Sequence, residues 1–152
     1  MDGADDPCCR MPMIWNDLKY DSRSRGPFGL FIKPTAIRFD AALHDYFRSL
    51  ILLRRTLEPL RRGSITFVHC DDEAESLAFA RGEGASQVLV AINRGQREAT
   101  IRLDLASLPS KKLTSLFHSS PSPGTLQQNG DQLSIVLSPN SGEVWRFAAS
   151  DD

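Results

Sequence analysis

The chain has 152 residues, of which 41% are apolar and 24% are charged, and its formal net charge is −1 at pH 7. This length and composition predict a soluble globular protein with one ordinary domain, or a small domain with an appendage. The near-neutral charge gives no reason to expect nucleic acid or an anionic membrane as a partner. No apolar run approaches the roughly 18 residues that a membrane span needs, so no membrane association is expected either.

The cysteines and the first residues of the chain indicate the cellular compartment in which the protein is expected. The chain has three cysteines, two of them adjacent (Cys8 and Cys9), and this arrangement does not suit a disulfide framework. The first 15 residues lack a basic stretch followed by an apolar core, so no signal peptide is expected. The simplest prediction is a reducing, cytoplasmic environment.

Residues 1–38 show no sustained periodicity, and four prolines interrupt any helix there, so an irregular segment is predicted. The segment nevertheless carries many large apolar side chains. Burying each would stabilise a fold by about 1.5–3 kcal/mol, so we expect them to need a covering surface. They are Met11, Met13, Ile14, Trp15, Phe28, Leu30, Phe31 and Ile32.

Residues 39–57 have the pattern of an amphipathic helix. Asp40 is placed to accept hydrogen bonds from the first turn, Arg54 and Arg55 complement the dipole at the other end, and Pro59 is expected to stop the helix. The C-terminal half is apolar around most of its circumference, so it needs partners on more than one side. The apolar residues at helical spacing are Phe39, Leu43, Tyr46, Phe47, Leu50, Leu53 and Leu57.

After the helix the apolar period changes from 3.6 to 2, which predicts β-strands separated by turns. The strongest hairpin signal is Asn129-Gly130. About seven short strands with regularly spaced turns predict a mainly β protein with an antiparallel β-sandwich. The predicted strands are residues 64–70, 75–81, 87–94, 99–103, 111–117, 132–137 and 143–147.

Several residue groups suggest chemistry, but a structural role explains each of them better. Trp145 could be an exposed platform for a sugar ring, yet its alternation with Val144 favours a place in the sandwich core. Three groups have a spacing that matches no metal site or thiol nucleophile. We therefore predict no metal, no cofactor and no catalytic residue. The groups are the Cys/His set (Cys8, Cys9, His69, Cys70, His118), Asp2 with Asp5 and Asp6, and the acidic turn Asp71, Asp72, Glu73 and Glu75.

The stretch DPCCRMPMIW at residues 6–15 resembles the D-P-x-x-R-x-P-M-x-W segment of glycoside hydrolase family 13, the α-amylase family. Later segments are similar to that family in order and spacing. They are FRSLILLRR (47–55), PLRRGS (59–64), DD through LAFAR (71–81) and VLVAINR (88–94). The most similar group contains cyclomaltodextrinases, neopullulanases, maltogenic amylases and related α-glucosidases.

The resemblance implies a C-terminal fragment. Residues 1–62 would be the remnant of a (β/α)8 catalytic barrel, with its last loop at 1–38 and its last helix at 39–57, and residues 63–150 would be the β-sandwich called domain C. The catalytic Asp, Glu and Asp of the family would lie upstream. His44-Asp45 lies inside the predicted helix, without the flanking strand of the family's His-Asp pair, and is rejected. Asp6 and Arg10 match family positions near bound sugar, so in a complete enzyme they would contact substrate.

Two classes of function follow. The first is the C-terminal portion of an α-glucan-active glycoside hydrolase, a stabilising part that has no catalysis of its own because hydrolysis needs two carboxylates flanking the bond. Its partners would be an α-glucan or maltooligosaccharide within a complete enzyme, and a second copy or a separate barrel chain bound through the helix 39–57. The alternative is a stand-alone carbohydrate-binding or barrel-docking β-sandwich.

Overall fold

The computed structural model describes residues 13–26, 29–109 and 112–147. The chain divides into two compact units, Met1–Leu52 and Leu53–Asp152, so the last turn of the long helix belongs to the second unit. Asp6 and Arg10 lie outside the described residues, as do Cys8 and Cys9. Within the described part, no helix is long and apolar enough to cross a membrane.

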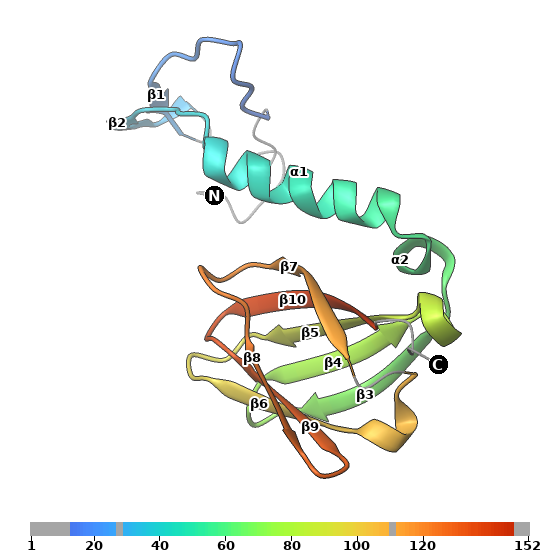
Figure 1. Ribbon diagram of the computed structural model, residues 1–152. Coiled ribbons are helices and arrows are strands. Elements are labelled where there is room, and N and C mark those ends of the chain that lie inside the picture. The colour runs from blue at the N-terminus through green and yellow to red at the C-terminus, as the bar shows by residue number, and fades with distance from the viewer. Residues whose placement is uncertain (1–12, 27–28, 110–111, 148–152) are drawn as a thin grey trace. The chain divides into compact units, whose positions relative to one another are not determined.

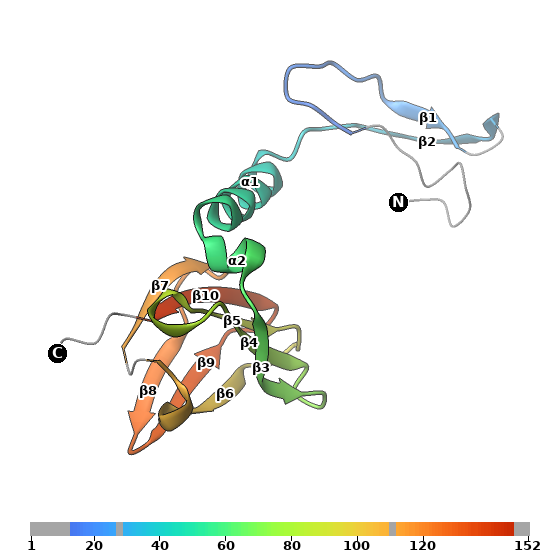
Figure 2. The same cartoon turned by 90° about the vertical axis from the view of Figure 1, so that its right-hand side faces the viewer.

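The first unit contains a β-hairpin, so the prediction that residues 1–38 are irregular was wrong in this part. β1 (Arg23–Arg25) pairs antiparallel with β2 (Phe31–Thr35). The pair is seen in Figure 2. The turn needs a left-handed backbone at Gly29, with φ of 77°, and closes through a Gly26 N–H that donates to Leu30 O at 2.7 Å. Pro34 is tolerated because a two-stranded sheet has only edge strands.

The predicted helix is present as α1 (Ala41–Thr56), two residues shorter at its start and one at its end. The Asp40 cap is confirmed, since Oδ1 of Asp40 accepts from the Leu43 N–H at 2.9 Å. The role predicted for Pro59 was wrong in part. A second helix, α2 (Glu58–Arg62), begins one residue earlier, and Pro59 lies in its first turn, where a missing N–H costs nothing.

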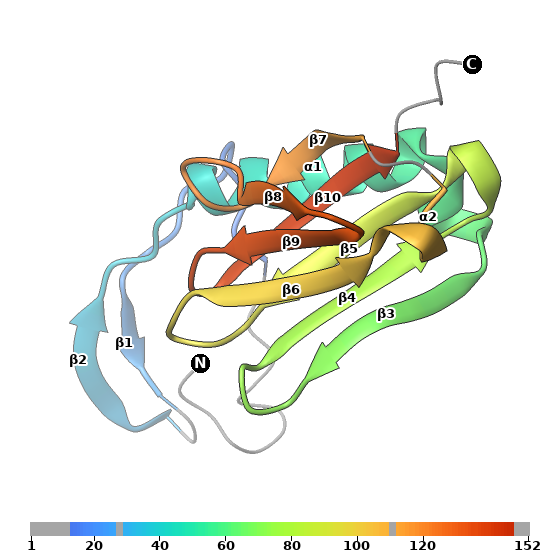
Figure 3. The same cartoon turned by 60° about the horizontal axis from the view of Figure 1, so that its bottom comes forward.

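The second unit is the predicted antiparallel sandwich, and its two sheets are seen in Figure 1 and, from another side, in Figure 3. The sheets have the orders β3-β4-β5-β10-β7 and β6-β9-β8. The strands are β3 (Ile65–Asp71), β4 (Ser76–Arg81), β5 (Val88–Asn93), β6 (Ala99–Asp104), β7 (Leu113–His118), β8 (Thr125–Asn129), β9 (Gln132–Leu137) and β10 (Ser141–Phe147). The 3₁₀ turns Gly84–Ser86 and Leu105–Ser107 lie between strands.

The seven predicted strands are confirmed, with ends that differ by at most two residues. β8 was missed because its sequence TLQQN has no alternation of apolar residues and all five residues are exposed. The β8–β9 turn does occur at the predicted Asn129-Gly130, where Gly130 has φ of 59° and Asn129 faces Gln132. The acidic residues Asp72, Glu73 and Glu75 lie in the β3–β4 turn.

The sandwich core lies between the two sheets. Trp145 and Phe147 of β10 are buried there against Ile101, Ile135 and Leu137 of the smaller sheet, so the prediction that Trp145 is a core residue is confirmed. The alternation is also confirmed, because Val144 belongs to a separate cluster on the opposite face of the five-stranded sheet, together with Leu57. That second cluster joins the ends of the helices to the sandwich.

Candidate functional site

The first unit contains a largely apolar groove of about 740 Å³. Its floor consists of one stripe of α1, formed by Leu43, Phe47 and Ile51, together with Met13 and Ile14 of the preceding segment. These side chains are exposed, and none of the residues of α1 is buried. Arg38, Asp40, His44 and Arg48 also line the groove, but its surface is mostly apolar, which suits another apolar surface better than a small polar ligand.

His44 and Asp45 lie inside α1, as predicted from the sequence. Nδ1 of His44 is 3.2 Å from Oδ1 of Asp45, and both side chains are exposed. The ring of His44 also stacks at a tilt on Phe39, with centroids 5.3 Å apart. An exposed pair on one helix has no strand behind it to fix its orientation, so its arrangement does not resemble a catalytic site.

Within the described residues, no group of three or more His, Cys, Asp or Glu side chains is placed to hold a metal ion. Asp71 accepts the Ala74 N–H at 2.9 Å, which closes the β3–β4 turn. Glu75 has a positive φ of 50° and accepts from Arg94 at 3.1 Å. Cys70 is a free, exposed thiol on β3.

Buried polar groups gather at one end of the sandwich, and Asn93 at the end of β5 is the best connected of them. Its Nδ2 lies 2.8 Å from Arg97 O, 2.9 Å from Ser138 O and 3.3 Å from Leu137 O. Because an amide nitrogen has two hydrogens, these three carbonyls share them. Its Oδ1 accepts the Gly95 N–H at 2.9 Å, so one side chain fixes the β5–β6 turn to the β9–β10 turn.

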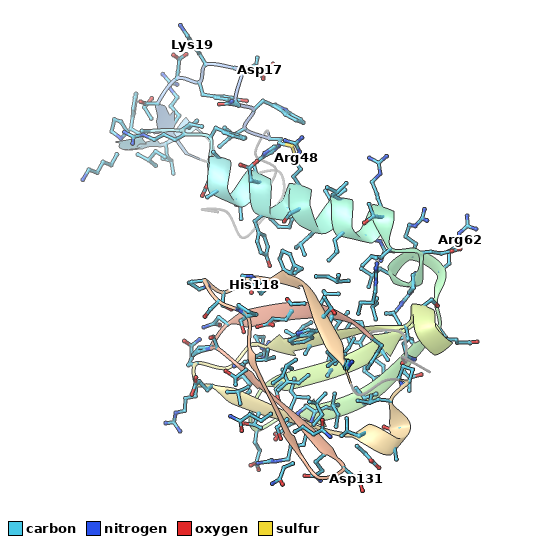
Figure 4. All side chains as sticks on the ribbon, viewed as in Figure 1. Asp17, Lys19, Arg48, Arg62, His118 and Asp131 are labelled. Carbon is cyan, nitrogen blue, oxygen red and sulfur yellow. The ribbon has the colours of Figure 1, made fainter. Side chains whose placement is uncertain are left out.

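Glu143 of β10 is the second unusual residue, because it is almost completely buried, with 1% exposure. Its Oε1 accepts the Gly124 N–H at 2.6 Å, whereas Oε2 is buried with no partner among the described residues. Burial raises the pKa of the Glu143 carboxyl, and the Gly124 hydrogen bond and the charge of His118 oppose this rise. His118 faces Glu143 across the β7–β10 ladder and is marked in Figure 4.

Neither Asn93 nor Glu143 was predicted from the sequence to have a special role. The burial of Glu143 could have been predicted from the sequence. Side chains alternate between the two faces of a strand, so residue 143 lies on the same inner face as Trp145 and Phe147. No comparable signal exists for Asn93, whose partners at residues 137 and 138 come from a distant part of the chain. Neither residue forms a catalytic pair with another described side chain, so both are structural.

No protein-family model matches the chain. A cyclomaltodextrinase from Geobacillus thermopakistaniensis is 30% identical over 105 residues, covering 69% of this chain and 15% of the relative. Neopullulanase 2 from Thermoactinomyces vulgaris is 32% identical over 102 residues, covering 66% of this chain and 14% of the relative. The crystal structure of a debranching enzyme from Nostoc punctiforme superimposes with a TM-score of 0.57 at 30% identity, over 71% of this chain and 20% of that one.

The chain belongs to glycoside hydrolase family 13, in its C-terminal region. The family resemblance of the sequence is thereby confirmed, and so is the mainly β fold with its antiparallel sandwich. This family 13 chain spans about 15% of the length of the curated relatives it matches. The enzymes it resembles are therefore matched over a small part only.

Proposed function

We propose that this chain is the C-terminal portion of an α-glucan-active glycoside hydrolase of family 13, and that it has no catalysis of its own. Residues 1–62 are the last loop and helix of the catalytic barrel, and residues 63–150 are domain C. Its role is to complete and stabilise the catalytic part, whether both parts are in one polypeptide or in two. The family relationship supports this reading, since the names of the relatives include cyclomaltodextrinase and neopullulanase.

The observation that carries the proposal is the composition of the first unit. Among its described residues none is buried, although helical periodicity gives α1 a wide apolar surface. A unit whose described residues are at most partly buried gains little hydrophobic free energy to offset the entropy of folding, so it belongs against a larger body. Its exposed large apolar side chains are Met13, Ile14, Trp15, Leu18, Leu30, Phe31, Leu43, Tyr46, Phe47, Ile51 and Leu52.

In a complete enzyme, the substrate would be an α-glucan or a maltooligosaccharide, and Asp6 and Arg10 would contact it. A carboxylate accepts from vicinal hydroxyls, and a guanidinium supplies a rigid set of donors. The catalytic carboxylates would come from the barrel, and residues 1–38 would be its last loop. The odd number of cysteines, with a free Cys70, is consistent with a place in the cytoplasm.

Incubation of the purified chain with a chromogenic maltoside tests this proposal. We expect no turnover above the rate without protein, because in this proposal the two carboxylates that hydrolysis needs come from the barrel. Clear turnover that copurifies with the chain would overturn the proposal. A sample of an active family 13 enzyme run in parallel shows that the assay detects hydrolysis.

A stand-alone carbohydrate-binding sandwich is not favoured. That function needs an aromatic platform that faces solvent, and Trp145 is in the core. Phe67 is the open aromatic residue of β3, but it packs edge-to-face on Phe79 and its neighbours in the sheet are apolar. A sugar site also needs polar groups that converge on the hydroxyls.

A further inference from the structure

The β1–β2 hairpin carries the most exposed of the described large apolar side chains. Phe31, the first residue of β2, is 81% exposed, whereas Ile32 next to it is half-buried. Successive side chains of a strand point to opposite faces, so Phe31 and Ile32 belong to different faces of the hairpin. Ile32 lies close to the turn, because a Cβ at Gly26 would be 3.0 Å from its Cγ2. We call the face that carries Phe31 the outer face of the hairpin.

Arg25 of β1 holds the ring of Phe31 from one side. The two residues are paired across the hairpin, and Cζ of Arg25 lies 5.0 Å from the centre of the Phe31 ring. A guanidinium above an aromatic face is attracted by the partial negative charge of that face. Because Arg25 lies over one face of the ring, the opposite face is the one open to a ligand. A ring whose orientation is already fixed loses less conformational entropy when a ligand binds.

The surroundings of Phe31 suit a ligand that combines an apolar face with hydroxyl groups. Lys33 is two residues further along β2, so it lies on the outer face too, and it is exposed. Arg25 and Lys33 thus bring N–H donors next to an aromatic face. The C–H groups of a glucose ring carry partial positive charge and pack on the negative face of an aromatic ring, while the hydroxyls at the rim accept hydrogen bonds. A glucose unit therefore matches the outer face.

The order of the elements determines on which side of a complete enzyme the hairpin would lie. Under the proposed function, residues 1–38 connect the last strand of the barrel to its last helix, and the hairpin is part of this loop. In a (β/α)8 barrel the loops that follow strands and precede helices surround the active site. The same loop carries Asp6 and Arg10, the predicted sugar contacts.

We propose that Phe31, held by Arg25, is a platform that stacks on a glucose unit of the α-glucan at a subsite away from the bond that is hydrolysed. The inference rests on the proposed function and adds a residue that determines which lengths of glucan are preferred. Asp6 and Arg10 match family positions near bound sugar, so the hairpin, which comes later in the loop, is assigned a sugar further out. Only a glucan long enough to reach the hairpin gains this contact.

Two other occupants fit the outer face less well. An apolar surface of the barrel would bring the charges of Arg25 and Lys33 into a dry interface, which costs free energy unless each charge is paired there. Nucleic acid needs a broad cationic surface, and Asp17 and Asp21 of the same unit partly offset its cations. A neutral sugar needs neither a dry interface nor an excess of positive charge.

The test uses a chimaera in which the C-terminal region of the Geobacillus cyclomaltodextrinase is replaced by the full 152-residue chain. The unsubstituted chimaera is compared with its variants Phe31→Ala, Phe31→Trp and Leu30→Ala. Leu30 is the matched control, because it is the neighbouring residue and is also apolar and exposed, at 66%, but offers no aromatic face. For each form, kcat and KM are measured with a short substrate, a chromogenic maltoside, and with a long one, maltoheptaose.

We expect Phe31→Ala to lower kcat/KM for maltoheptaose by about 3–10-fold and to leave kcat/KM for the maltoside unchanged. The loss should come from a higher KM, because a contact far from the cleaved bond holds the ground state and the transition state equally. Phe31→Trp should keep the preference for the long substrate, since indole offers a larger aromatic face. Leu30→Ala should behave like the unsubstituted chimaera with both substrates.

Unchanged kinetics in Phe31→Ala, or equal losses with both substrates, would show that Phe31 is not a platform, while the proposed function would stand. A lower Tm of the chimaera as the only effect of Phe31→Ala would instead assign Phe31 to packing against the barrel. A length-dependent loss that Leu30→Ala reproduces would also refute a role for the aromatic ring. An unsubstituted chimaera that fails to fold or to hydrolyse either substrate refutes the proposed function and the platform together.

Discussion

At the scale of single residues, two buried polar side chains determine how one end of the sandwich is built. Asn93 joins two turns through hydrogen bonds to backbone groups, and Glu143 joins β10 to the residue that precedes β8. Gly124 must be glycine for this, because a Cβ there would lie 3.0 Å from Oε1 of Glu143 and 2.6 Å from Val136 O. Asn93 and Glu143 occupy core positions with hydrogen-bonded polar groups in place of apolar packing. Substitutions at these two positions are therefore expected to change the stability of the fold strongly.

Replacing Asn93 should be among the most destabilising single changes in the sandwich. Asn93→Ala removes the side-chain donor that the carbonyls of Arg97, Leu137 and Ser138 share, although Ser138 O keeps the Ser141 hydroxyl as a donor. The expected cost is about 3 kcal/mol in the free energy of unfolding. Asn93→Asp should cost more, since a carboxylate oxygen would face three carbonyl oxygens. Urea denaturation followed by the near-ultraviolet circular dichroism of the buried Trp145 measures both. A loss below 1 kcal/mol for both variants would contradict the role assigned to Asn93.

The burial of Glu143 is expected to make the stability of the sandwich depend on pH in an unusual way. Because burial raises its pKa above the unfolded value, the folded state holds the proton more tightly. Its contribution to stability is fully present below the unfolded pKa and is lost as pH rises through the folded pKa. Glu143→Gln should therefore gain stability relative to the parent chain as pH rises through that window. Urea denaturation at a series of pH values from acid to neutral measures the difference.

Two features distinguish the pH-dependent contribution of Glu143 from other effects of the substitutions on stability. The Nε2 of the introduced Gln is a buried donor without a partner, which costs about 1–3 kcal/mol at every pH and does not change the slope. His118→Gln removes a charge that lowers the pKa of Glu143, so the loss of stability should extend to higher pH in that variant. Parallel curves for Glu143→Gln and the parent chain at all pH values would refute the assignment.

At the scale of elements, the connection between the helices and the sandwich depends on a close approach of two glycines. A Cβ at Gly63, which follows α2, would lie 2.6 Å from Gly82 N and 2.7 Å from Pro59 O. The Gly82 N–H donates to Ser64 O at 3.0 Å, so the linker is held to the end of β4. Arg81 adds a hydrogen bond from its Nε to Pro59 O at 3.2 Å.

Gly63→Ala tests this close approach free of backbone strain, because Gly63 has an ordinary φ of −64°. The added methyl group must displace backbone atoms, which do not yield as a flexible side chain does, so we expect a loss of about 1–3 kcal/mol. Gly84→Ala is the complementary variant. Its Cβ would meet nothing, but its φ is +55°, so it should lose about 1 kcal/mol from backbone strain alone. Thermal unfolding of the two variants compares these costs, and an unchanged Tm for Gly63→Ala would show that the linker moves freely.

The elements also show what sequence reasoning reaches. α1 and seven strands of the sandwich were predictable, because the apolar residues of each recur at the period of a helix or of a strand. β8 and the β1–β2 hairpin were not, since TLQQN and RSR have no apolar period and form by pairing with a neighbour. The roles of Asn93 and Glu143 come from contacts with residues distant in sequence. The predicted sugar contacts, Asp6 and Arg10, lie outside the described residues and stay a prediction.

At the scale of the whole molecule, the two units differ in how much they bury. The second unit has a continuous core between two sheets, so it contains the hydrophobic free energy that a domain needs. The described part of the first unit buries no side chain and has an apolar groove along α1. An apolar surface left open on an isolated chain lowers its free energy by associating with another apolar surface.

The isolated chain should therefore self-associate as its concentration rises. The stripe of Leu43, Phe47 and Ile51 is the expected contact, since it forms the floor of the groove. Phe47→Gln combined with Ile51→Gln should shift the sedimentation profile to monomer, because glutamine keeps the helix propensity and removes the apolar surface. Leu52→Gln is the control: Leu52 is exposed but does not line the groove, so that variant should still associate. A parent chain that stays monomeric at high concentration would show that the first unit covers its own apolar surface, and the need for a catalytic partner would lose its physical basis.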